Sequence, residues 1–89
     1  MSILDAPIEQ HFLIVTKRLS DLASGEGGVV EDIASNAITA KLVEMGLYKG
    51  KPVRVLFRAP LGDPIAVDVD GYTLSLRKDE AVLISVVAD

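Results

Sequence analysis

The chain has 89 residues, of which 49% are apolar, and it carries a formal net charge of −4. This length holds a single folded domain, and the absence of cysteine excludes a disulfide scaffold, a zinc–thiolate site and a thiol nucleophile. Lys and Arg are scattered along the sequence, so no clustered basic surface for a nucleic-acid partner is predicted.

Residues 1–18 are predicted to form a leader that precedes the folded domain. Within it, residues 12–16 are predicted as a short strand or a tether, and this apolar run is far too short to span a bilayer. Asp5 and Glu9 occupy the region where a secretory signal would carry basic residues. We therefore expect a cytoplasmic protein with no direct membrane insertion.

Residues 17–22 are predicted to form one helical turn, in which Leu19 and Leu22 share a side. The glycine-rich segment 24–28 follows as a turn. A phosphate-binding loop would need a Lys-Ser or Lys-Thr pair opening a helix, whereas a strand is predicted next, over 29–33. The glycines are therefore interpreted as a turn signal.

Ser35 or Asn36 can cap a helix, because each offers a side-chain oxygen to the free amide hydrogens of a first turn. The predicted helix carries an apolar stripe and a polar face; the stripe is Ile38, Leu42 and Met45, and the face has Lys41 and Glu44. Gly46 is predicted to end the helix in the left-handed conformation, with Leu47 folding back onto its last turn.

The strands are predicted from apolar residues that alternate with polar ones. Asp70-Gly71 joins two of them as a two-residue hairpin, residues 78–80 form a 3₁₀ turn, and residues 82–87 are the closing strand. The alternation places Val29 and Ile33 on one side, and it predicts these inward-facing residues: Val53, Val55, Phe57, Ile65, Val67, Val69, Tyr72, Leu74 and Leu76.

Five short strands cannot stack as two full sheets at this length, so they are predicted to curl into a small barrel, which removes most exposed strand edges. The predicted fold class is all-β with one short helix, as a small SH3-like five-stranded barrel over residues 19–89.

An ordered set of short segments then carries a resemblance to a known family. They are Leu19-Ser20-Asp21-Leu22, residues 41–50, Val53-Arg54-Val55, residues 58–64, Gly71-Tyr72, residues 74–77 and Glu80-Ala81. With this set, the sequence resembles the FeoA family, small bacterial cytosolic proteins associated with the ferrous iron transporter FeoB. Lys41 and Lys49 depart from the Arg and Pro that family members often carry. The resemblance implies an SH3-like fold and a role as accessory to a membrane GTPase that imports ferrous iron.

A partner-binding patch is predicted at the loop 59–64 and at the end of the helix. Pro60 and Pro64 stiffen the loop, and Leu61 is flanked by turn-forming residues near its tip. The predicted contact residues are Leu47, Tyr48, Arg58, Pro60, Leu61, Gly62 and Arg77, with the two arginines steering toward an acidic partner surface. In the alternative, Leu47 and Leu61 fold back onto the barrel.

Other chemistry is weakly indicated. Asp68 and Asp70 point the same way along a strand and could offer oxygens to a hard cation, but a solvated strand face is the favoured interpretation. The single histidine, His11, lies in the leader and cannot serve a catalytic triad. With Phe57 and Tyr72 predicted inward, too few aromatic rings remain for recognition of proline-rich peptides. No catalysis, cofactor or metal site is predicted.

Three functions remain open from the sequence. The favoured one is a non-enzymatic module that binds the cytosolic domain of a FeoB-type membrane GTPase, with a homo-oligomer possible. The second is a stand-alone SH3-like regulatory domain related to DtxR-type metal-dependent repressors. The third is a chaperone that binds iron directly.

Overall fold

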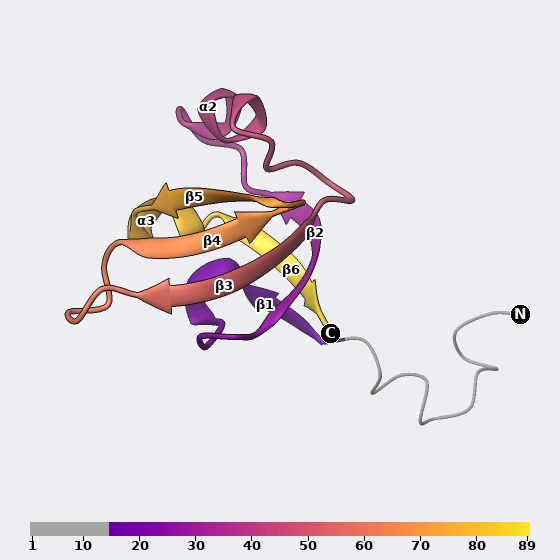
Figure 1. The fold of residues 1–89 in the computed structure, drawn as a ribbon. Helices are drawn as coiled ribbons and strands as arrows, with labels where there is room; N and C mark the ends of the chain where they lie inside the picture. The colour runs from indigo at the N-terminus through magenta and orange to yellow at the C-terminus, as the bar shows by residue number, and fades with distance from the viewer. Residues whose placement is uncertain (1–14) are drawn as a thin grey trace, which may run out of the picture.

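A computed structural model describes residues 15–89, so the predictions on His11 and on residues 12–14 of the apolar run lie outside the described residues. The described part folds as one antiparallel sheet with short helical segments at its margins (Figure 1). The strands are β1 (Thr16–Arg18), β2 (Gly27–Ile33), β3 (Pro52–Arg58), β4 (Ile65–Val69), β5 (Tyr72–Leu76) and β6 (Ile84–Ala88).

The strand order is β1-β6-β2-β3-β4-β5, and every neighbouring pair is antiparallel. The predicted five-stranded closed barrel is therefore corrected on two points. A sixth strand is present because Thr16, Lys17 and Arg18 pair with β6. The sheet is also open, since β1 and β5 stand at its two ends and do not pair with each other.

Three short helical segments accompany the sheet, where one helix and two tight turns were predicted. They are the 3₁₀ turn η2 (Leu19–Asp21), α2 (Thr39–Glu44) and α3 (Lys78–Ala81). The predicted cap of α2 is corrected: the Asn36 side chain accepts a hydrogen bond from the Ile38 amide (3.3 Å), ahead of the helix, and no side chain caps its first turn. Among residues 15–89, no helix has the length and apolar content needed to cross a bilayer.

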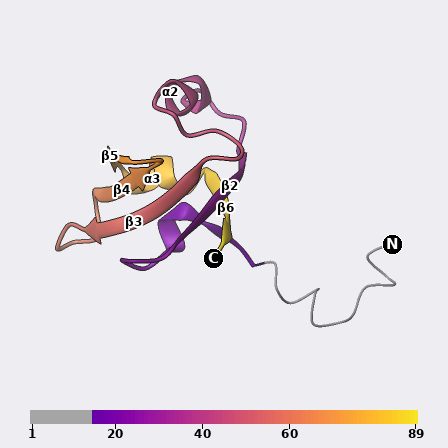
Figure 2. The same cartoon turned by 45° about the vertical axis from the view of Figure 1, so that its right-hand side comes forward.

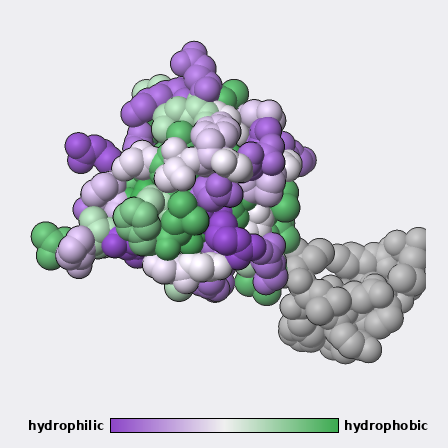
Figure 3. All heavy atoms as spheres, in the orientation of Figure 1, coloured by the Kyte–Doolittle hydropathy of each residue, from purple (hydrophilic) through white to green (hydrophobic). Residues whose placement is uncertain are grey.

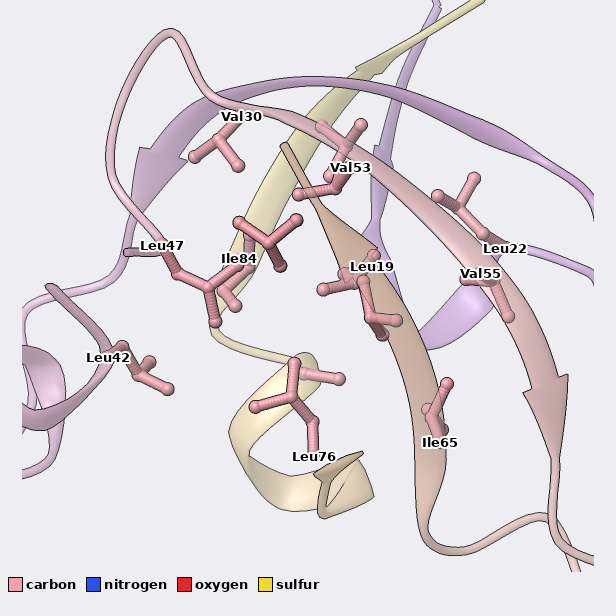
Figure 4. Packing of buried hydrophobic residues seen from close by; sticks show 14 residues of the cluster. Leu19, Leu22, Val30, Leu42, Leu47, Val53, Val55, Ile65, Leu76 and Ile84 are labelled. Carbon is pink, nitrogen blue, oxygen red and sulfur yellow. The ribbon is translucent and has the colours of Figure 1, made fainter. Parts of the chain in front are cut away.

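The core lies inside the curved sheet, and residues of η2, α2 and α3 contribute to it (Figure 4). Leu19, the first residue of η2, and Leu22, which follows it, have no exposed surface, as their shared side predicts. Leu42 is buried on the inner face of α2, with Ile38 and Met45 packed beside it. The largest fully buried side chains are Leu19, Leu22, Leu42, Leu47, Ile65, Leu76, Ile84, Val30, Val55, Val67, Val69 and Val86.

Two bulges change the predicted faces of the strands. In β2 the pairing register shifts between Val30 and Asp32, so Val30 is buried while Val29 is exposed. In β3 it shifts between Val55 and Phe57, and the extra residue turns Phe57 outward, where 61% of it is exposed. The predicted inward position of Phe57 is therefore wrong, and Tyr72, at the start of the edge strand β5, is also exposed.

Glycines mark one close approach and one turn. Gly27 and Gly28 belong to β2 rather than to the predicted turn, and a Cβ on either would overlap a backbone carbonyl, of Val53 and of Val87 respectively. The hairpin between β4 and β5 is confirmed, since Asp70 (φ 49°) and Gly71 (φ 101°) both have the positive φ that its two-residue turn requires.

Candidate docking site

The loop between β3 and β4 closes on itself and projects from one end of the sheet (Figure 1). The Ala59 amide donates to the Pro64 carbonyl (3.0 Å), and the Gly62 amide donates to the Ala59 carbonyl (2.7 Å). Gly62 has a φ of 86°, which the tight turn requires. The loop is also fixed to α3, because the Asp63 carboxylate accepts a hydrogen bond from the Lys78 amide (2.9 Å).

The loop presents apolar side chains to solvent. Leu61 is 97% exposed, and Phe57, at the end of β3 from which the loop starts, is 61% exposed. Pro60 is exposed between them. In the space-filling view an apolar group stands at the projecting left-hand end of the molecule (Figure 3). We call Phe57, Pro60 and Leu61 the apolar tip.

Arg58 fixes the end of β3 from which the loop starts. Its guanidinium donates hydrogen bonds to the carbonyl oxygens of Ser20 (2.6 Å) and Leu22, and so ties the end of β3 to η2. One carbonyl lies within η2 and the other belongs to the residue that follows it, and a planar guanidinium can bond both at once. The geometry therefore gives Arg58 a structural task, and its steering role toward a partner stays a prediction.

The two halves of the predicted patch are far apart. Leu47 is fully buried, because Gly46 (φ 95°) reverses the chain and the Leu47 amide donates to the Leu42 carbonyl (3.0 Å), as the helix-end pattern predicts. Tyr48 is exposed, but it precedes β3, whereas the apolar tip follows it. A strand of this length separates them by roughly 20 Å, and the turned view shows the segment after α2 and the loop at the two ends of β3 (Figure 2).

A hollow of about 330 Å³ lies beside the apolar tip, between the loop, α2, the end of β5 and α3. Its lining residues are Lys41, Asp63, Pro64, Ser75, Arg77 and Glu80. Of these lining residues, Arg77 alone was predicted to contact a partner. Lys41 and Glu80 lie 39 residues apart in sequence, and no local pattern brings them together.

Glu80 is the one buried charged residue of this hollow. One carboxylate oxygen accepts the Lys41 ammonium (2.8 Å), and the other accepts the Arg77 backbone amide (2.8 Å). The bond to Lys41, and then that to the Arg77 amide, lower the pKa of Glu80 below its ordinary value of 4.5. The carboxylate is therefore ionised, with both oxygens hydrogen-bonded, and it holds the Lys41 ammonium at the lining of the hollow.

Asp68 and Asp70 are the carboxylates that the sequence offered to a cation. Asp70 pairs with Lys51 (3.1 Å). Within residues 15–89, no group of three or more His, Cys, Asp or Glu side chains is placed to hold a metal ion. Direct iron binding stays the third alternative that the sequence left open.

Comparison with known proteins places this arrangement in a family. The model of the FeoA domain matches residues 17–88. A Fe(2+) transport protein A/Fe(2+) transporter FeoB fusion protein from Porphyromonas gingivalis is 36% identical over 70 residues, which are 78% of this chain. The chain spans only 8% of the length of that fusion protein.

Solved structures share the fold. An iron uptake regulatory protein (FeoA) superposes with a TM-score of 0.76 at 31% identity, over 84% of this chain and 99% of that one. A FeoA from Stenotrophomonas maltophilia, described as a prokaryotic SH3 domain protein and complexed with zinc, gives 0.67 at 34%, over 84% and 89% of the two chains. The SH3-like character expected from the sequence is thus found among its structural relatives.

The fold also occurs inside a regulator. A manganese-dependent transcriptional repressor superposes with a TM-score of 0.75 at 26% identity, over 85% of this chain and 43% of the repressor. The FeoA domain match runs from β1 to β6, over residues 17–88. The chain belongs to the FeoA family, whose members are associated with ferrous iron transport.

Proposed function

We propose that this protein is a cytosolic, non-enzymatic accessory of ferrous iron transport that binds the soluble domain of a FeoB-type membrane GTPase through the apolar tip. The observation that carries the proposal is Leu61, which is 97% exposed at the end of a closed, stiff loop. A leucine in that position contributes nothing to the core of its own domain.

The free energy gained on docking comes from a few apolar side chains. Burial of one leucine side chain contributes about 1.5–3 kcal/mol, and Phe57 adds aromatic area beside it. The internal hydrogen bonds of the loop lower the ordering cost, since the backbone is already fixed before a partner arrives. These features favour a small, preorganised binding site.

The choice of partner rests on the relative from Porphyromonas gingivalis. In that protein a FeoA part and a FeoB part are joined in one chain. A fusion of this kind keeps two parts at high effective concentration, which is useful where separate chains must otherwise associate. For the present chain, the separate GTPase is therefore the proposed partner.

Binding can be measured by biolayer interferometry with the immobilised soluble domain of the FeoB-type GTPase from the same organism. Leu61→Asp places a charge in the buried contact and is expected to weaken binding at least about tenfold. Tyr48→Asp is the matched control, because Tyr48 is also exposed but lies at the other end of β3. Equal affinity of wild type and Leu61→Asp, with both folded by circular dichroism, would refute the assignment.

A second candidate function is supported by the repressor with the same fold. In that case the chain would regulate transcription through a separate DNA-binding protein. A gel-shift assay with the operator DNA of a DtxR-type repressor from the same organism, with and without this protein, tests it. A change in the repressor's affinity for its operator would favour this function over the transporter accessory.

A further inference from the structure

We infer that the hollow beside the apolar tip receives a carboxylate side chain of the protein partner, with Arg77 as its principal ligand. This inference rests on the proposed function and adds the chemistry of a second contact. The hollow is lined by Asp63 and Pro64, which follow Leu61 by only a few residues. One partner surface can therefore reach the apolar tip and the hollow together.

The hydrogen-bonding groups around the hollow are unequally used. The Arg77 guanidinium and the Ser75 hydroxyl donate to no other residue within 15–89. Lys41 spends one N–H on Glu80, and its exposed ammonium keeps the others. Glu80 has committed both of its oxygens, while Asp63 has committed one. Unused donors thus outnumber unused acceptors, which favours a ligand that supplies oxygen acceptors.

The net charge of the lining indicates what kind of ligand supplies those oxygens. The positive charges of Lys41 and Arg77 are balanced by the negative charges of Asp63 and Glu80. A free polyanion would therefore gain little net attraction from this site. A carboxylate delivered by a docked protein behaves differently, because contact at Leu61 has already met the entropic cost of association. Arg77 can then bond it in the planar, two-pronged geometry that a guanidinium prefers.

Glu80 acts on this site as a positioning residue. Its buried carboxylate fixes the Lys41 ammonium at 2.8 Å, and its bond to the Arg77 amide fixes the backbone from which the Arg77 side chain starts. Glu80 thereby fixes the Lys41 ammonium and the start of the Arg77 side chain at the lining of one hollow.

The inference is tested with the same GTPase domain and three more variants. Arg77→Met is expected to weaken binding at least about tenfold and to reduce its salt dependence. Arg77→Lys should keep part of the affinity, because it keeps the charge but not the fork. Lys78→Met, a neighbouring cation whose side chain is outside the lining, is the control and should change affinity less than about twofold.

Charge reversal identifies the partner group. Arg77→Glu should abolish binding, and substitution of one surface Asp or Glu of the GTPase domain by Lys should restore it. If Leu61→Asp weakens binding while Arg77→Met matches Lys78→Met, or if no such Lys restores Arg77→Glu, the carboxylate contact is wrong and the docking function stands. If the wild type does not bind, both are overturned.

Discussion

The Tyr72 hydroxyl occupies the space that a side chain on residue 46 would need. It donates a hydrogen bond to the Met45 carbonyl (2.7 Å), and a Cβ on Gly46 would overlap the hydroxyl oxygen and lie 3.2 Å from Cζ. The end of α2 is thereby attached to the edge strand β5. Gly46 thus serves two requirements, a φ of 95° and a close approach.

Gly46→Ala is therefore expected to lower the free energy of unfolding by about 1–3 kcal/mol, from backbone strain and from displacement of the tyrosine. Tyr72→Phe removes the hydroxyl and should cost about 0.5–1.5 kcal/mol alone. Urea denaturation of both single variants and the double variant measures the coupling. The double variant should be more stable than the sum of the two losses predicts, and strict additivity would contradict the overlap.

The ion pair of Glu80 predicts a pH dependence of stability. Because the folded state lowers the pKa of Glu80, the stabilisation is present above its ordinary value of 4.5 and is lost as pH falls through the lower, folded value. Glu80→Gln should cost about 1–2 kcal/mol at pH 7, and the gap from wild type should shrink as pH falls below 4.5.

Thermal unfolding of the two proteins across that pH range measures the gap. Asp79→Asn is the matched control, because this exposed carboxylate in the same helical turn has no hydrogen bond to another residue in the described part of the chain. A gap for Glu80→Gln that stays constant with pH would contradict the role of its ionised form.

Arg58 is expected to matter for stability more than for binding. Arg58→Lys retains the charge, but a single ammonium cannot reproduce the planar fork that bonds the carbonyls of Ser20 and Leu22. A loss of about 1–3 kcal/mol is expected in urea denaturation. Arg77→Lys, whose guanidinium donates to no residue within 15–89, should stay within about 0.5 kcal/mol of wild type. Equal losses for the two variants would refute the structural role.

The parts of the fold that depend on residues adjacent in the sequence could be predicted. The Asp70-Gly71 hairpin and the reversal of Leu47 after Gly46 follow from local turn chemistry, and both are confirmed. The exposure of Phe57 was not predictable, because alternation assumes a regular strand and a bulge after Val55 breaks it. That bulge depends on pairing with β4, which a single strand does not reveal.

The candidate site divides in the same way. Leu61 could be identified from its turn-forming neighbours, whereas its separation from Tyr48 depends on the full length of β3, which lies between them. The Lys41–Glu80 pair joins elements 39 residues apart. Ion pairs of that kind depend on how the helices pack against the sheet, and no sequence spacing predicts them.

The most direct test of the docking claim is site-specific photocrosslinking in cells that contain the FeoB-type transporter. A photoreactive amino acid is placed at position 61 in one variant and at position 48 in the other, since both native side chains are exposed. The docking account predicts a crosslink to the transporter from position 61 and none from position 48. A crosslink from position 48 alone, or from neither position although both variants support iron uptake, would contradict it.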